Sequence, residues 1–190
     1  MRNLLFFILL SCTNSLWAQN EKYDTSKFMF IENTKSFNTI EDVLKLKQFK
    51  NKIVYIDLWG YGCAACMKEF DYLPEIKAKY KNSQVAYLYI YYKFADSVST
   101  DIKNNYWIKY SIDKQLYGTH LLASIQPIQT INNAHVPTIR ETQTITLDKD
   151  IYAIPRYMLA DQTGKIKIFD APRPNEKEKL FALINQLLTL

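Results

Sequence analysis

Glycine is scarce in this chain, with 4 residues among 190, whereas tyrosine is abundant at 14. Few glycines and many aromatic side chains argue against a disordered or low-complexity protein. Dense blocks of lysine or arginine are also lacking, because the net charge of +5 comes from basic residues scattered among acids. A nucleic-acid-binding role is therefore not expected. With 48% hydrophobic and 23% charged residues, the composition is that of an ordinary globular domain.

The apolar run at the N-terminus is too short to cross a bilayer as a stable helix, which needs about 20 residues. It covers Leu4–Leu10, follows the basic Arg2, and leads through polar residues to Ala18. This order is typical of a secretory signal peptide cut after Ala18. In the alternative interpretation, Leu9–Cys12 is a bacterial lipoprotein box, and Cys12 carries a lipid anchor. Both interpretations predict export to the periplasm or cell envelope.

Cysteine is rare as well, at 3 residues. Removal of the leader would leave only Cys63 and Cys66, spaced C-x-x-C. An exported protein with two such cysteines has no disulfide framework to build. The pair can carry out redox chemistry or bind a metal weakly.

The pattern of apolar residues and turn signals predicts one α/β domain. Its order favours a mixed sheet flanked by helices on both faces, with an insertion before a final β-hairpin and C-terminal helix. The expected division is a signal peptide over 1–18, a tail and strand over 19–37, and the domain over 38–190, with an irregular insertion at about 111–150. Strands are expected at 28–31, 53–59, 85–92, 154–160 and 165–169, and a possible further strand lies near Leu121 within the insertion. Helices are expected at about 40–46, 63–80 (kinked at Pro74), 99–110 and 175–188.

The cysteine pair falls where the strand over 53–59 gives way to a helix. Cys63 would begin that helix, where free backbone N–H groups and the positive end of the helix dipole favour a thiolate. The thiolate is the attacking species in disulfide exchange. Cys66 lies one helical turn further on the same face and more deeply buried, so that it can resolve a mixed disulfide formed at Cys63.

Two acids near the pair are candidates for moving protons. Asp57 lies in the middle of an apolar strand, where a carboxylate is costly and its pKa should be raised, which suits a proton acceptor for Cys66. The alternative is a strand-end Asp57 exposed to water. Glu69 follows Cys66 by three residues and is a second candidate for proton exchange, the alternative being an ordinary solvated helix side chain.

The pattern Asp57-x-Trp59-x-x-Gly62-Cys63-x-x-Cys66-x-x-Glu69 resembles the thioredoxin superfamily, specifically its exported TlpA/ResA-like branch of thiol–disulfide oxidoreductases. The segment Ile154-Pro155-Arg156-Tyr157, followed by Asp161-x-x-Gly164-Lys165, resembles the part of that family that carries a cis-proline, a hairpin and a C-terminal helix. The resemblance covers about 38–190 apart from the insertion.

The resemblance implies a thioredoxin-like fold and a dithiol that works without a cofactor. It implies that Pro155 lies opposite the dithiol with a cis peptide bond, which an X–Pro bond tolerates at a cost of only about 0.5–1 kcal/mol. A trans proline that opens a strand is the alternative. The expected partners are protein disulfide or dithiol substrates and an upstream membrane or soluble redox protein. Because Ala64-Ala65 lacks the histidine of strongly oxidising relatives, a reductant is favoured, as in cytochrome maturation or envelope redox homeostasis.

Three departures from the family pattern bear on this expectation. Gly62 stands where the family usually has tryptophan, Asp71 stands where proline is usual after Glu69-Phe70, and the segment over 92–154 is longer than in the family. His135-Val136-Pro137 also resembles a cis-proline tripeptide, but no hairpin pattern follows it. Pro155 is therefore preferred.

Two other classes of function stay open. Cys63 and Cys66 with His120 or His135 form a possible metal site, although a structural zinc prefers four ligands and the two histidines are not spaced as a local pair. A lone histidine in a loop is more often a surface residue. A binding module that keeps the fold without catalysis is the second alternative.

Overall fold

The computed structural model describes residues 24–31, 37, 39–60, 62–82, 84–92, 106–123 and 154–190. The signal peptide expected over 1–18, Cys12, the His135-Val136-Pro137 tripeptide and most of the expected insertion lie outside these residues. Strands are β1 (Phe28–Ile31), β2 (Ile53–Trp59), β3 (Val85–Tyr92), β4 (Gly118–Ala123), β5 (Arg156–Ala160) and β6 (Ile166–Ile168). Helices are α1 (Ile40–Leu44), α2 (Ala64–Glu69), α3 (Leu73–Lys79), α5 (Tyr106–Asp113) and α8 (Lys177–Leu188), with 3₁₀ turns η1 (Thr25–Lys27), η2 (Lys47–Phe49), η3 (Phe70–Tyr72) and η4 (Pro174–Glu176).

A six-stranded sheet forms the centre, in the order β1-β4-β3-β2-β5-β6. The pairs β1–β4, β4–β3 and β3–β2 are parallel, and β2–β5 and β5–β6 are antiparallel. The mixed sheet that the sequence predicts is therefore confirmed, together with its final hairpin. The hairpin turns where Asp161 Oδ1 accepts the backbone N–H groups of Thr163 and Lys165.

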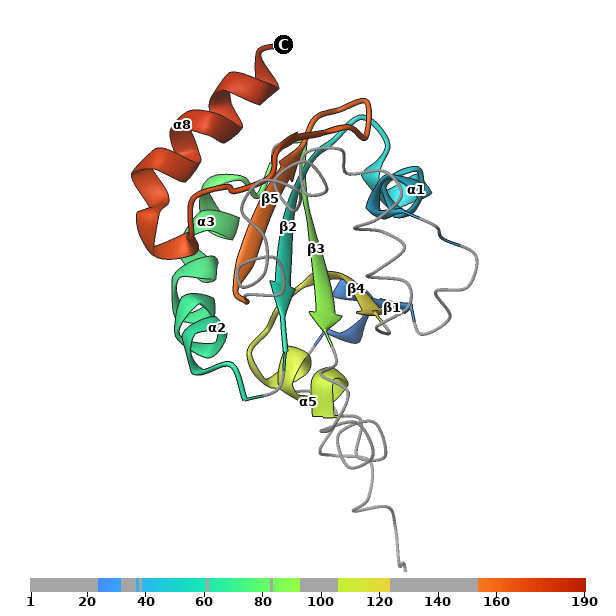
Figure 1. The fold of residues 1–190 in the computed structure, drawn as a ribbon, viewed down its shortest axis with the longest axis vertical. Helices are drawn as coiled ribbons and strands as arrows, with labels where there is room; N and C mark the ends of the chain where they lie inside the picture. The colour runs from blue at the N-terminus through green and yellow to red at the C-terminus, as the bar shows by residue number, and fades with distance from the viewer. Residues whose placement is uncertain are drawn as a thin grey trace, which may run out of the picture.

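Side chains of β2 alternate between two cores, one on each face of the sheet, because successive strand residues point in opposite directions. Val54 and Ile56 pack with α1 on one face. Tyr55 and Trp59 pack with α2, α3 and α8 on the other. Figure 1 shows the same division, with α1 on one side of the strands and α2, α3 and α8 on the opposite side. Both faces of β2 are thus covered, as its nearly continuous apolar sequence predicts.

The helix expected over 63–80 is two helices. A 3₁₀ turn, η3, separates α2 from α3, and Pro74 lies in the first turn of α3. A proline is well tolerated there because the first N–H groups of a helix have no intrahelical partner. The expected kink at Pro74 is therefore wrong: Pro74 helps to begin a helix instead of bending one.

The first part of the insertion expected from about 111 forms regular secondary structure, so the expectation of an irregular segment is wrong there. Residues 106–113 form α5, which ends beyond the position expected at 110, whereas residues 99–105 of the expected helix lie outside the described residues. Residues 118–123 form β4, which lies between β1 and β3 inside the sheet. The possible strand near Leu121 is therefore present as β4. Within the described residues, no helix is long and apolar enough to cross a membrane.

Gly118 begins β4 with φ +149°, where a Cβ would come within 2.7 Å of the Tyr87 carbonyl oxygen. We expect Gly118→Ala to lower the free energy of unfolding by about 2 kcal/mol or more, because steric overlap adds to backbone strain. Gly62→Ala is the matched control: its φ is +76° but no atom lies within 4 Å of the added Cβ, so only strain of about 1–2 kcal/mol applies. Urea unfolding measures both, and equal losses would contradict the steric argument.

Candidate redox-active site

Cys63 and Cys66 form a disulfide at the start of α2, with their Cα atoms 5.3 Å apart. Cys63 is the N-cap residue of α2, and its Sγ accepts the backbone N–H of Cys66 at 3.1 Å. Cys66 is completely buried, whereas Cys63 is half-buried. The sulfur that an incoming protein can reach is therefore that of Cys63.

A short turn after β2 places Cys63 at this helix start. The backbone N–H of Cys63 is bonded to the Gly60 carbonyl at 3.3 Å, and that of Ala64 to the Gly62 carbonyl at 3.1 Å. Gly62 adopts φ +76°, which is unfavourable for residues with a side chain. The tryptophan usual in the resembled family would be strained in this backbone conformation. Glycine at position 62 therefore places no side chain directly before Cys63.

Asp57 lies on the same face of β2 as Trp59 and Tyr55, the face against which Cys66 packs. The strand register sets Tyr89 of β3 opposite it on one side and Tyr157 of β5 on the other. Asp57 is 1% exposed, and neither its carboxylate oxygens nor the two tyrosine hydroxyls have a hydrogen-bond partner among the described residues. Burial raises the pKa of Asp57 well above its ordinary value, and the negative charge of Glu69 raises it further. Asp57 is therefore held towards its protonated form.

Lys77 of α3 opposes this effect, and the sequence analysis did not single it out. Its positive charge lowers the pKa of Asp57, although less than burial raises it. Burial lowers the pKa of Lys77 itself to about 7. The ammonium group donates a hydrogen bond to the Tyr117 carbonyl at 2.8 Å and lies 5.2 Å from the ring centre of Tyr89. The place of Lys77 beside the apolar Ile76 and Tyr80 in an amphipathic helix is the one feature of the sequence that points to its burial.

Glu69 at the end of α2 is 5% exposed, so its interpretation as a solvated helix side chain is wrong. Its Oε2 accepts the backbone N–H of Asn175 in η4 at 3.0 Å. This bond connects the helix that carries the dithiol to the turn that leads into α8. Glu69 thus has a structural contact in addition to its electrostatic effect on Asp57.

The peptide bond between Ile154 and Pro155 is cis. β5 begins immediately afterwards, and Arg156 pairs with Leu58 near the end of β2. This register places Pro155 at the end of the sheet from which the chain leads to Cys63. Ile154 and Cys63 are both half-buried against the same core. The fold therefore brings Pro155 and the dithiol to one end of the sheet.

His120, a candidate metal ligand, is completely buried in β4, so that its expected position in a surface loop is wrong. Its Nε2 donates to the Leu116 carbonyl at 2.7 Å, which leaves Nδ1 to accept from the Ser111 hydroxyl at 3.2 Å. Burial lowers the pKa of His120 to about 3, so the ring is neutral. Both ring nitrogens are thus occupied by protein groups. No cluster of three or more metal-ligating side chains occurs in the part of the chain that the structure describes.

Comparison with known proteins supports the resemblance. No family model matches the chain. It is 32% identical over 81 residues to the thiol–disulfide oxidoreductase ResA of Bacillus thuringiensis, which covers 40% of this chain and 47% of the relative. It is 33% identical over 94 residues to ResA of Bacillus cereus, covering 46% and 51%. The chain therefore spans about half the length of the curated relatives it matches.

Among solved structures, the chain resembles a thiol:disulfide interchange protein from Bacteroides sp. with a TM-score of 0.51. This similarity covers 76% of the chain and 78% of the other protein. Because the sequences are only 18% identical, it concerns the fold. It confirms the expected thioredoxin-like architecture. The thioredoxin-like fold and the dithiol at the start of α2 are thus accompanied by sequence similarity to ResA thiol–disulfide oxidoreductases over about half of their length.

Proposed function

We propose that the protein is a thiol–disulfide oxidoreductase that exchanges electrons between the Cys63–Cys66 pair and disulfides of other proteins. The observation that carries the proposal is the asymmetric burial of the pair: Cys63 is reachable at the start of α2, and Cys66 is enclosed in the same core as Asp57. Disulfide exchange requires one sulfur that forms a mixed disulfide with the substrate and a second sulfur of the same protein that then attacks this mixed disulfide.

In the reducing direction, the Cys63 thiolate attacks one sulfur of the substrate disulfide, and the other substrate sulfur leaves as a thiolate and takes up a proton. Asp57, in its ionised form, accepts the proton of the Cys66 thiol. The Cys66 thiolate then attacks Cys63 Sγ, forms the Cys63–Cys66 disulfide and releases the second substrate thiolate. The net reaction transfers two electrons from the dithiol to the substrate disulfide. The two substrate thiolates take up protons from the surrounding water, Asp57 releases the proton of Cys66, and an upstream redox protein would return the pair to its reduced form.

Pro155 and Glu69 have supporting roles in this proposal. Pro155 lacks a backbone N–H, so the chain beside it leaves neighbouring backbone groups available to an extended substrate segment near Cys63. Glu69 adds negative charge near Asp57, which raises the pKa of Asp57 and makes its ionised form a stronger proton acceptor.

We further propose export to the periplasm or cell envelope, by cleavage after Ala18 or with lipidation of Cys12, and a reducing role there, as in cytochrome maturation. Mass spectrometry of the protein purified from bacterial envelopes distinguishes the two forms. An N-terminus at Gln19 indicates cleavage by signal peptidase, and an acylated N-terminal Cys12 indicates a lipoprotein. A full-length protein that stays in the cytoplasm would contradict export.

The direction of electron flow is tested by the reduction potential of the Cys63–Cys66 pair, measured by equilibration against dithiol buffers. We expect a value near about −270 mV, in the range of thioredoxin, because Ala64-Ala65 places no histidine beside the thiolate. A value near about −120 mV would make the protein a disulfide donor instead. Absence of a reversible two-electron couple would refute dithiol exchange altogether.

A further inference from the structure

A cavity of about 370 Å³ lies on the α3 side of the sheet, away from the start of α2 that carries the dithiol. It is enclosed by α3, by the segment that connects α5 to β4, and by η1. Its apolar surface comes from Leu73, Pro74, Ala78 and the ring of Tyr117. The only charged side chains that line it are four lysines, namely Lys27, Lys77, Lys81 and Lys114, and Gln115 completes the lining within the described residues.

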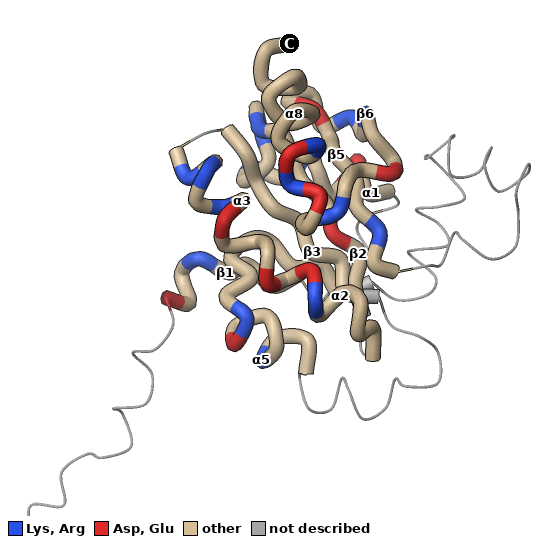
Figure 2. The backbone as a smooth tube through the Cα atoms, turned by 90° about the vertical axis from the view of Figure 1, so that its left-hand side faces the viewer, with Lys and Arg blue, Asp and Glu red and all other residues tan. Residues whose placement is uncertain are grey.

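The lysines bring more positive charge to this cavity than the surrounding acids balance. Lys27 is paired with Asp24 at 3.2 Å, and Lys114 with Asp71 at 3.2 Å. Both acids lie outside the cavity lining, and Lys81 has no ion pair among the described residues. Figure 2 shows basic positions in α3, before β1 and near α5 on one side of the molecule.

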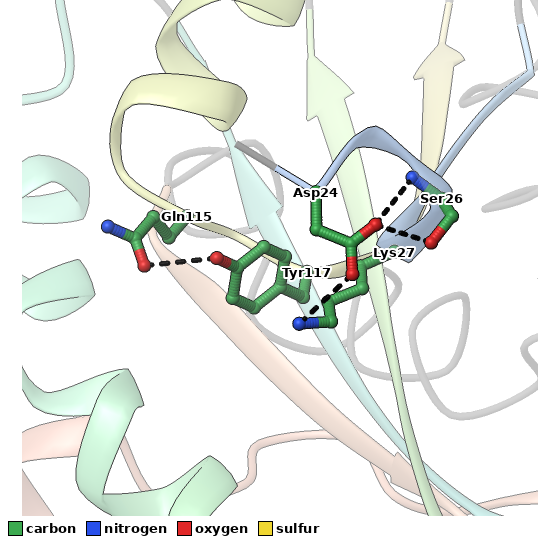
Figure 3. A network of polar contacts seen from close by, with 5 residues as sticks. All are labelled: Asp24, Ser26, Lys27, Gln115 and Tyr117. Atoms are coloured by element: carbon green, nitrogen blue, oxygen red, sulfur yellow. Dashed lines mark hydrogen bonds and ion pairs between the residues drawn. The ribbon is translucent and has the colours of Figure 1, made fainter. Parts of the chain in front are cut away.

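Two of the ammonium groups approach the same aromatic ring. Lys27 Nζ lies 5.0 Å and Lys77 Nζ 5.5 Å from the ring centre of Tyr117. Figure 3 shows Lys27 and Tyr117 side by side, with the Tyr117 hydroxyl bonded to Gln115. Like charges gathered around one ring repel each other, so an anion between them would be stabilised.

The size of the cavity is in the range of small-molecule sites, which extends from about 300 to 1,000 Å³. Its apolar wall disfavours a fully hydrated anion such as inorganic phosphate, whereas its lysines disfavour a neutral or cationic molecule. An anionic group attached to an apolar body satisfies both surfaces. We propose that this cavity binds a small amphipathic organic carboxylate, with the carboxylate among the lysines and the apolar body against Leu73, Pro74 and Ala78.

Binding of such a ligand has a consequence for Lys77. A neighbouring carboxylate favours the charged form of Lys77, whose pKa is about 7 in the free protein. Binding at pH 8 should therefore take up protons from the buffer. The titratable groups that face Lys77 from the packed elements are Asp57 of β2, Tyr87 and Tyr89 of β3, His120 of β4, Tyr117, and the lysines of the cavity.

Isothermal titration calorimetry of the purified oxidised protein with octanoate tests the proposal, with octanol and octylammonium as comparison probes. We expect saturable binding of one octanoate per chain, with at least tenfold weaker binding of both comparison probes. Titration in two buffers of different ionisation enthalpy at pH 8 should show proton uptake. Equal affinity for octanol would show a merely apolar surface and overturn the proposal, as would no binding of octanoate.

Variants at exposed positions locate the site without disturbing the core. Ala78→Trp fills the cavity and should abolish octanoate binding, and Lys81→Gln should weaken it by about three- to tenfold, as expected for loss of one partly screened charge. Lys68→Gln removes an exposed lysine of α2 outside the cavity and should leave the affinity unchanged. Octanoate binding that survives Ala78→Trp would contradict this location. None of these readouts depends on dithiol exchange.

Discussion

Replacing Cys66 with serine should convert the protein into a trap that stays covalently attached to its substrates through Cys63. The half-buried Cys63 can still attack a substrate disulfide, but the buried serine hydroxyl at position 66 cannot attack Cys63 Sγ and release the substrate. Steady-state reduction of insulin should fall by at least about 1,000-fold, since the sulfur that completes the reaction is absent. The mixed disulfide should be visible by non-reducing electrophoresis and mass spectrometry.

Cys63→Ser is the matched control for this experiment. It removes the reachable sulfur and leaves Cys66 enclosed, so we expect an equally large loss of activity but no mixed disulfide. Equal trapping by the two variants would show that both sulfurs meet the substrate. The assignment of Cys63 as the attacking residue and Cys66 as the resolving residue would then be wrong.

The second large effect is expected from Asp57→Asn, whose influence on stability should depend on pH. The pKa of Asp57 is raised in the folded protein, so the folded state binds the proton more tightly than the unfolded state. Ionisation therefore destabilises the fold as the pH rises above the ordinary pKa of 3.8. Asparagine at this position removes that penalty. The unfolding free energy of the variant minus that of the parent should therefore be at least about 1 kcal/mol larger at pH 8 than at pH 3.

The same substitution should slow disulfide exchange, because asparagine cannot accept the proton of Cys66. A loss of about 100-fold or more in the resolution step is expected for removal of a general base. Stopped-flow measurement of mixed-disulfide decay between pH 5 and pH 9 should also show loss of the pH dependence contributed by Asp57. Asp71→Asn, at an exposed position, is the control and should alter neither property. An unchanged rate and pH profile in Asp57→Asn would remove Asp57 from the mechanism.

Much of this site can be predicted from the sequence because local patterns determine it. The apolar sequence of β2 places Asp57 inside the sheet, and the following glycines place Cys63 at a helix start. The hairpin signal after Pro155 distinguishes it from Pro137. Each of these features depends on residues within about ten positions of one another, the range over which periodicity and turn chemistry are informative.

Features that depend on distant parts of the chain were not predicted. Lys77 acts on Asp57 only because α3 packs across β2, and its sequence neighbourhood is that of any amphipathic helix. The sequence offers a possible strand near Leu121, but β4 is short, begins with a glycine and contains His120, so the sequence does not indicate its place inside the sheet. Its place between β1 and β3, together with hydrogen bonds of both His120 ring nitrogens to Leu116 and Ser111, makes it a buried strand. Tertiary packing outweighs local propensity at such positions.

The order of the strands also bears on how the site is assembled. Asp57 pairs with Tyr89 across a connection that contains α2 and α3, whereas Phe28 meets Gly118 and Asp57 meets Tyr157 across much longer stretches of chain. Closing longer loops costs more entropy, so β2, α2, α3 and β3 are expected to associate before β1 and β5 join them. That early unit already contains both cysteines but not Pro155. A newly made chain would thus carry two reactive thiols before it has the segment that aligns a partner. Until β5 joins the sheet, these thiols can form unintended disulfides with cysteines of other proteins.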